Sequence, residues 1–120
     1  MFCALVSVAF AQAVPAAPTV QSLSGTYHLS QMEMGGALAL WSDGRFRYML
    51  DYGAVSEAAE GKWRLAADGL HLTSEPLPRE VLIEAERSDA GLKDVVLRID
   101  GDTLVMERYD TRMFFRRVQP

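Results

Sequence analysis

The chain has 120 residues, of which 49% are hydrophobic and 23% charged, a composition that suits one globular domain with a hydrophobic core. Its net charge of −4 excludes the basic footprint of a protein that binds nucleic acid or an anionic membrane surface by charge. The sequence holds no phosphate-binding loop, dinucleotide fingerprint, nucleophile elbow or zinc-protease motif, so none of the common catalytic signatures is present.

The N-terminal segment has the composition of an export signal. Residues 2–10 (FCALVSVAF) form an apolar run of the length found in signal peptides, and Ala9-Phe10-Ala11 matches the small-residue cleavage pattern. The run is too short to span a bilayer. We therefore predict a signal peptide over residues 1–11 and a periplasmic or secreted mature chain. The alternative is a buried N-terminal strand or helix.

The only cysteine, Cys3, lies within that segment. The exported chain would therefore contain no disulfide, no thiolate nucleophile and no cysteine-bound metal. Residues 12–23 are rich in Ala and Pro, which is typical of an extended tether. We predict a single β-barrel domain over residues 24–119.

Alternation of apolar and polar residues predicts a series of short β-strands. The cleanest pattern covers residues 45–52, where every second side chain is apolar and so lies on one face of a strand. Asp43-Gly44 and Asp68-Gly69 separate such runs and predict tight hairpin turns, because glycine adopts the positive φ that these turns require. We expect strands over residues 25–30, 37–41, 45–52, 61–65, 70–73, 81–85, 95–99, 104–106 and 112–118.

Two segments interrupt the first half of this pattern. Residues 53–60 (GAVSEAAE) lose the alternation and predict a longer loop or a single helical turn. Pro76 and Pro78 predict a connection, because proline cannot donate a hydrogen bond within a central strand. Alternation returns over residues 81–85. No segment has the pattern of a convincing amphipathic helix.

These features predict an all-β protein, an antiparallel up-and-down meander of eight or nine strands. A calycin-like barrel is the expected architecture, because closing the sheet removes its unpaired edges. The long C-terminal strand would then pair back with the first strand. A β-sandwich is the alternative. The interior of an eight-stranded barrel is filled by side chains or holds one small ligand.

The chain resembles the small exported bacterial proteins with a calycin-like, lipocalin-like β-barrel. The resemblance covers roughly residues 25–73. It implies an exported barrel that binds a small apolar or amphipathic molecule. The motifs that carry it are Gly25-x-Tyr27, Asp43-Gly44-Arg45-Phe46, Tyr52-Gly53-Ala54, Gly61-x-Trp63 and Leu70-x-Leu72.

Aromatic side chains supply the candidate ligand-binding residues. Tyrosine and tryptophan combine an apolar ring with a hydrogen-bonding group, which suits the lining of a small-molecule pocket. The alternative is that these rings form the hydrophobic core. The candidates are Tyr27, Phe46, Tyr48, Tyr52 and Trp63.

The polar residues predict no reaction. His28 and His71 fall on the outer face, where a surface role is commoner than metal binding. Glu57 and Glu60, in the predicted loop, are expected to be solvated carboxylates rather than an acid–base pair. The charged run from 107 to 117 predicts exposed cross-strand ion pairs, with an arginine cluster for an anionic partner as the alternative. We therefore expect no catalytic residue, no metal and no cofactor.

Two functions remain open. The first is an exported barrel that binds a small hydrophobic ligand. The alternative is a protein-interaction or structural module of the cell envelope with a filled core. The first predicts a cavity and a small-molecule partner, whereas the second predicts an exposed contact surface and a protein partner.

Overall fold

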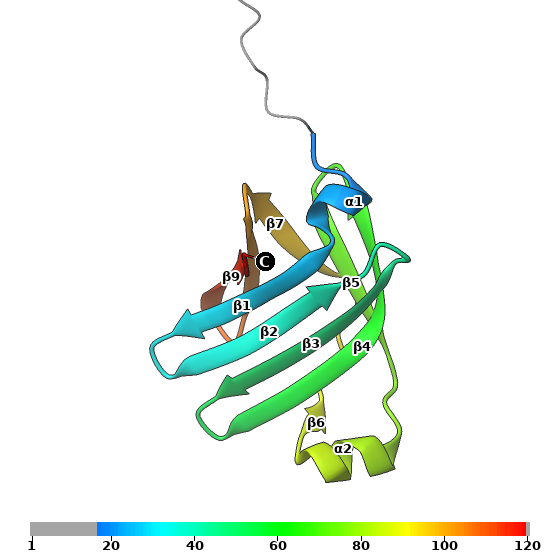
Figure 1. Ribbon diagram of the computed structural model, residues 1–120. Helices are drawn as coiled ribbons and strands as arrows, with labels where there is room; N and C mark the ends of the chain where they lie inside the picture. Colours follow the sequence, from blue (N-terminus) through cyan, green and yellow to red (C-terminus); the bar gives the residue numbers. More distant parts are fainter. Residues whose placement is uncertain (1–16, 120) are drawn as a thin grey trace, which may run out of the picture.

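The structure is a computed structural model that describes residues 17–119. The predicted signal peptide, residues 1–11, and the start of the predicted tether, residues 12–16, lie outside the described residues. Within residues 17–119, eight antiparallel strands close a β-barrel, and a short ninth strand lies beside it (Figure 1). The all-β fold and the antiparallel barrel predicted from the sequence are confirmed.

Most of the described residues lie in strands. Two short helices accompany them, α1 (Val20–Leu23) before the first strand and α2 (Arg79–Ala85) between the fifth and sixth. The strands are β1 (Gly25–Gln31), β2 (Met34–Leu40), β3 (Arg45–Tyr52), β4 (Val55–Ala66), β5 (Gly69–Glu75), β6 (Ser88–Asp89), β7 (Val95–Asp100), β8 (Thr103–Arg108) and β9 (Thr111–Arg117).

The barrel follows the order of the chain. Each barrel strand pairs antiparallel with the next, and β9 pairs with β1, so the predicted return of the last strand to the first is confirmed. Strand β6 is the exception. Its two residues pair parallel with β4, and β6 is not one of the eight strands that close the barrel. Asp43-Gly44 lies in the turn between β2 and β3, and Asp68-Gly69 lies where the turn after β4 leads into β5, with φ of 91° at Gly44 and 139° at Gly69. These positive angles explain why glycine stands there.

The prediction of a loop or helical turn over residues 53–60 was wrong. Only Gly53 and Ala54 form the turn, and β4 begins at Val55. Every second residue of β4 faces inward, including Glu57, which is only 2% exposed. A charged side chain at an inward position hides the alternation on which the sequence prediction depends.

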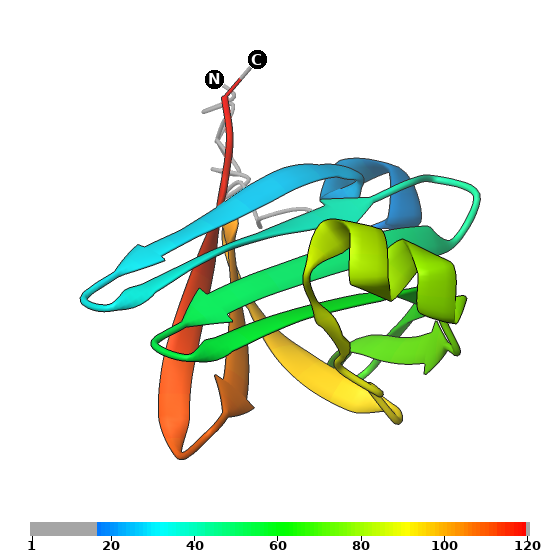
Figure 2. The ribbon, with the colours of Figure 1, turned by 90° about the horizontal axis from the view of Figure 1, so that it is seen from below.

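The predicted strand over residues 81–85 is the helix α2. Pro78 precedes its first turn, Glu80 lies within that turn, and Glu86 ends it with a left-handed φ of 55°. Proline is common at the start of a helix, and acidic residues near the N-terminus stabilise a helix by interacting with its dipole. The alternating residues Val81 and Ile83 are 48% and 64% exposed, so their spacing did not mark a buried strand face. Seen from below, α2 lies outside the wall formed by β3 and β4 (Figure 2).

The predicted extended tether gains structure at its C-terminal end, where α1 forms one helical turn. Thr19 caps this turn, because its hydroxyl accepts a hydrogen bond from the Ser22 amide. Leu23 is buried at the end of the turn and its carbonyl accepts a 2.7 Å hydrogen bond from the Tyr27 hydroxyl. The segment that leads into the barrel therefore packs against it.

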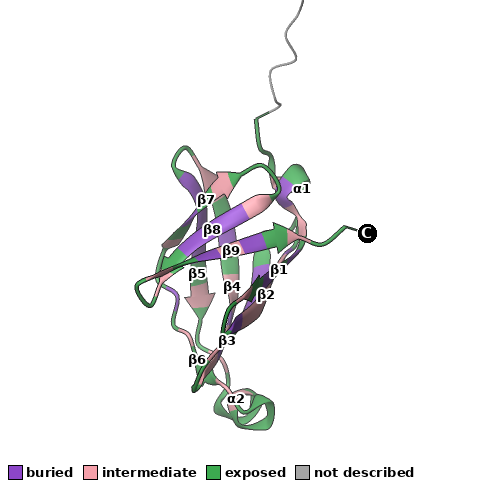
Figure 3. Cartoon of the chain, turned by 90° about the vertical axis from the view of Figure 1, so that its left-hand side faces the viewer, coloured by how far each residue is buried: buried purple, intermediate pink, exposed green. Residues whose placement is uncertain are grey.

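The barrel interior is a hydrophobic core. Buried residues lie along the strands, whereas α2 is mostly exposed (Figure 3). Alternate residues of each barrel strand point inward and form one cluster with Leu23 and Leu92, which enter from outside the strands. The largest rings of this cluster are Tyr27, Phe46, Tyr48, Trp63 and Phe115.

Trp63 allows a direct test of this core. Its side chain is 5% exposed, and its indole nitrogen donates a 2.8 Å hydrogen bond to the Trp41 carbonyl. We expect W63A to lower the free energy of unfolding by about 3–5 kcal/mol in a chemical denaturation experiment. Trp41 is 41% exposed, so W41A is the control and should cost about 1 kcal/mol or less. Equal losses in the two variants would contradict the packing described.

Candidate functional site

A hollow of about 830 Å³ opens at the end of the barrel where α1 lies. Its walls come from α1, from the turn between β4 and β5, and from β7 with the turn that follows it. The buried side of the hollow is apolar, and its rim carries three charged side chains. The apolar lining includes Leu23, Leu65 and Ile99, and the charged residues are Asp68, Arg98 and Asp102.

Arg117 fixes the α1 wall of this hollow. Its guanidinium stacks over the Tyr27 ring at 4.9 Å and donates a 2.7 Å hydrogen bond to the Tyr27 hydroxyl. The same group donates to the carbonyls of Ser22 and Ser24, at the end of α1. Its Nε also lies 3.5 Å from Asp102 on the rim. One side chain from the last strand thus holds the helix, the first strand and the rim together.

A second ionic group fixes the opposite rim. His71 projects from the outer face of β5, where the sequence placed it, but its side chain is only 9% exposed. Its Nε2 lies 2.6 Å from Asp68, and its Nδ1 lies 2.7 Å from Asp94. Arg64 also contacts this group, at 3.1 Å from Nδ1 and 3.4 Å from Asp94. Hydrogen bonds to Asp68 and Asp94 raise the pKa of His71, although burial and the Arg64 charge oppose the shift.

The other end of the barrel holds a buried ion pair. Arg108 donates two hydrogen bonds to the Glu57 carboxylate, at 3.0 and 2.9 Å. The hydroxyls of Tyr48 and Tyr109 donate two more, at 3.1 and 3.0 Å. Tyr109 stacks on Tyr52 with 6.3 Å between ring centroids. The carboxylate therefore has four donors, and its charge is matched by a bidentate arginine.

The chemistry of Glu57 follows from these contacts. Burial opposes its ionisation, but hydrogen bonds from Arg108 and Tyr109 outweigh burial and hold its pKa below the usual value. Burial and the neighbouring carboxylate raise the pKa of the Tyr48 phenol. Glu57 is thus a charged acceptor and Tyr48 a neutral donor. A carboxylate held ionised in this way is poorly suited to accept or deliver protons, because general acid–base groups need a pKa near the working pH.

The five predicted ligand-binding residues are distributed over the length of the barrel. Tyr27 and Tyr48 lie in one cross-strand row with Leu38 between them, and Phe46 lies one row nearer to α1. With Trp63, they are buried in the core. Tyr52 is half-buried and stands apart, stacked on Tyr109 at the end opposite the hollow. Ligand binding by these five residues stays a prediction.

Sequence reasoning missed the Glu57–Arg108 pair. Glu57 was expected to be a solvated loop carboxylate, and Arg108 to belong to an exposed ladder; both expectations were wrong. An exposed pair of the expected kind does occur between Glu107 and Arg112, at 3.4 Å. The available signal was the inward alternation of Trp63 and Ala59, which extends backwards along β4 to Glu57.

Searches of family models, curated proteins and solved structures found no match to this chain. Neither helix within residues 17–119 has the length and apolar character to cross a membrane. The same residues bring together no group of three or more histidine, cysteine or acidic side chains able to hold a metal ion.

The buried ion pair predicts that two glutamates of β4, Glu57 and Glu60, contribute unequally to the free energy of unfolding. We expect E57A to lower the free energy of unfolding by about 3–5 kcal/mol, because it leaves the Arg108 charge partly buried without its partner. Glu60 pairs with Arg47 at 2.9 Å on the exposed face, so E60A is the matched control and should cost about 1 kcal/mol or less. Urea denaturation of both variants tests this difference. A mild loss in E57A would show that the pair contributes little.

The His71 group predicts a pH dependence of stability. Because the pKa of His71 is raised in the folded chain, its contribution is complete below the unfolded value of about 6.5 and is lost as pH rises through the folded value. In the wild type, the measured free energy of unfolding should therefore fall as pH rises from about 6.5 through the raised pKa of His71. It should fall less in H71Q. The H28Q control removes the exposed histidine of β1 and should keep the wild-type dependence.

Proposed function

We propose that this protein is an exported β-barrel that binds a small, mainly apolar molecule in the hollow at the α1 end. The observation that carries the proposal is the hollow itself, about 830 Å³ with an apolar floor and a charged rim. This size falls within the range of small-molecule pockets, which combine an apolar lining with a few polar groups. Export is supported by the apolar run and the cleavage pattern within residues 1–11.

The arrangement of the walls supports binding at this end rather than in the middle of the barrel. Tyr27, Phe46 and Tyr48 are at most 1% exposed, so a ligand among them would have to displace core side chains. Leu65 and Ile99, in contrast, point inward at the open end and are only partly covered. Their apolar surface is free to be buried by a ligand, which is the main source of affinity in such sites.

The second candidate is the envelope interaction module. The specific observation in its favour is the helix α2, which leaves Val81 48% and Ile83 64% exposed. A protein partner that covers this helix would bury them. This candidate predicts no small molecule in the hollow, so one experiment on the exported chain addresses both.

The test is native mass spectrometry of the protein purified from the periplasm of an expression host. We expect an additional mass that is lost on denaturation, on a chain of 120 − 11 = 109 residues if cleavage follows Ala11. Ala67 is an exposed residue that lines the hollow, so A67W should remove the additional mass. Ala54 is exposed in the turn at the opposite end, so A54W is the matched control and should retain it.

Other results would argue against the proposal. A bare mass in all three proteins would favour the interaction module. An additional mass that A67W does not remove would place the ligand elsewhere in the barrel. An uncleaved chain would contradict export through the predicted signal.

A further inference from the structure

We propose that the molecule bound in the hollow carries an anionic group, which Arg98 binds at the rim. This inference rests on the proposed function and specifies the chemical class of its ligand. The ligand would be an amphipathic anion, with an apolar body and one carboxylate, sulfonate or phosphate group. Two features of the hollow support an anionic ligand. One is the set of charged groups around it, and the other is β7, which contributes both an outward arginine and an inward apolar side chain to the lining.

The charges around the hollow can be assigned one by one. Asp68 contacts His71, which also contacts Asp94, and Arg64 completes this group of two acids and two bases. Asp102 is paired with Arg117. Both carboxylates of the rim therefore already face cations. A cationic ligand would have to compete with partners that are part of the protein.

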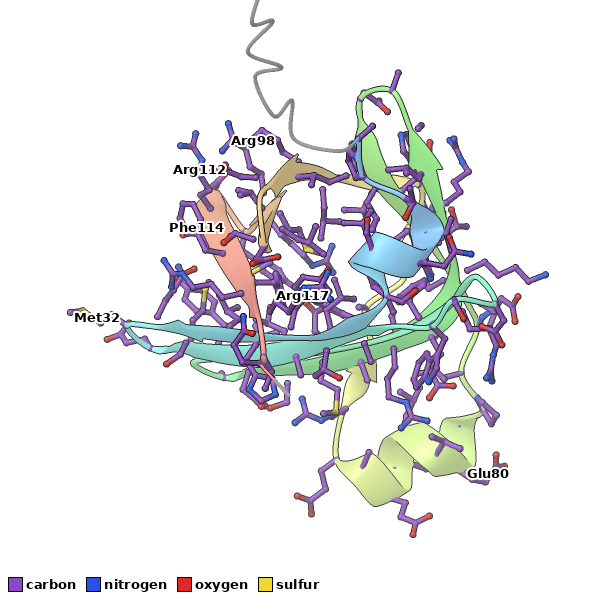
Figure 4. All side chains as sticks on the ribbon, turned by 45° about the horizontal axis from the view of Figure 1, so that its top comes forward. Met32, Glu80, Arg98, Arg112, Phe114 and Arg117 are labelled. Atoms are coloured by element: carbon purple, nitrogen blue, oxygen red, sulfur yellow. The ribbon has the colours of Figure 1, made fainter. Side chains whose placement is uncertain are left out.

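Arg98 differs from the two acidic residues of the rim. Among residues 17–119, no carboxylate lies within ion-pair distance of its guanidinium, although Asp100 follows two positions along the same face of β7. Figure 4 shows Arg98 projecting from the barrel on the same side as Arg112, whereas Arg117 lies in its interior. Arg98 is thus the charged group of the rim whose hydrogen-bond donors remain open to a ligand.

The position of Arg98 on β7 orients such a ligand. Successive residues of a strand point to opposite faces, so Ile99 lines the interior while Arg98 stands at the outer rim. The apolar body would lie on Leu23, Leu65 and Ile99, and the anionic group would remain at the mouth near solvent. The planar guanidinium can bind two oxygens of a carboxylate or sulfonate at once. An anion at this depth keeps part of its hydration, which limits the cost of binding it.

Two fluorescent probes separate the contribution of the charge from that of the apolar body. Anilinonaphthalene sulfonate and N-phenylnaphthylamine share one ring system and differ by the sulfonate. We expect the folded wild type to bind the sulfonate probe about tenfold more tightly than the neutral probe. This preference would oppose the overall charge of −4, so it requires a local cation. R98Q should lose the preference and keep its affinity for the neutral probe.

Arg116 supplies the matched control. It is an exposed arginine on the outer face of β9 that does not line the hollow, so R116Q removes the same charge from a neighbouring surface. R116Q should keep the wild-type preference. An equal loss in R98Q and R116Q would assign the effect to general charge and overturn the role of Arg98. Circular dichroism of each variant confirms that the probes report on folded protein.

The remaining outcomes distinguish this inference from the function on which it rests. If wild type and R98Q bind both probes equally well, and A67W blocks both, the hollow is a binding site but the anionic class is wrong. If neither probe binds, or if A67W has no effect on binding, the proposed site fails and the inference fails with it.

Discussion

The pairing of the last strand with the first is the constraint on which the rest of the structure depends. β1 and β9 share only two residue pairs, Tyr27 with Arg117 and His28 with Arg116. This contact gives every barrel strand within the described residues two neighbours, which removes the exposed edges of an open sheet. Arg117 reinforces it, because its guanidinium stacks on Tyr27 and holds the end of α1. Arg117 therefore contributes both to the closure of the barrel and to the wall of the hollow.

The two ends of the barrel differ in how far the protein itself covers the side chains that lie there. At one end, Glu57 and Arg108 neutralise each other, and two tyrosine hydroxyls complete the coordination of the carboxylate. A buried carboxylate requires this complete set of partners, so the cluster is satisfied within the protein. At the other end, apolar side chains remain partly uncovered beneath a charged rim. The hollow with uncovered apolar side chains therefore lies at the α1 end.

The local patterns that were predicted correctly depend on interactions between near neighbours. Alternation over residues 45–52 marks β3, and the glycines at 44 and 69 adopt the positive φ of their turns. One error arose because a distant partner allows a charged residue to face the core, and the other arose within a single helix. Residues 53–60 were predicted as a loop or a helical turn because the segment loses the alternation, yet Arg108, 51 residues away, allows the charged Glu57 to face inward. Residues 79–85 form a helix, although Val81 and Ile83 alternate as in a strand.

The sequence by itself determined the all-β class and the hairpin turns, because period-two alternation and glycine turns act over a few residues. The prediction of an export signal over residues 1–11 also rests on the sequence alone. Only the tertiary structure decided which charges are buried and where the hollow opens. The partners of Glu57 and Asp102 come from strands distant in the sequence, and Arg98 stands out only after those pairs are known. Residue spacing does not encode contacts of this kind, because they exist only once the barrel has closed.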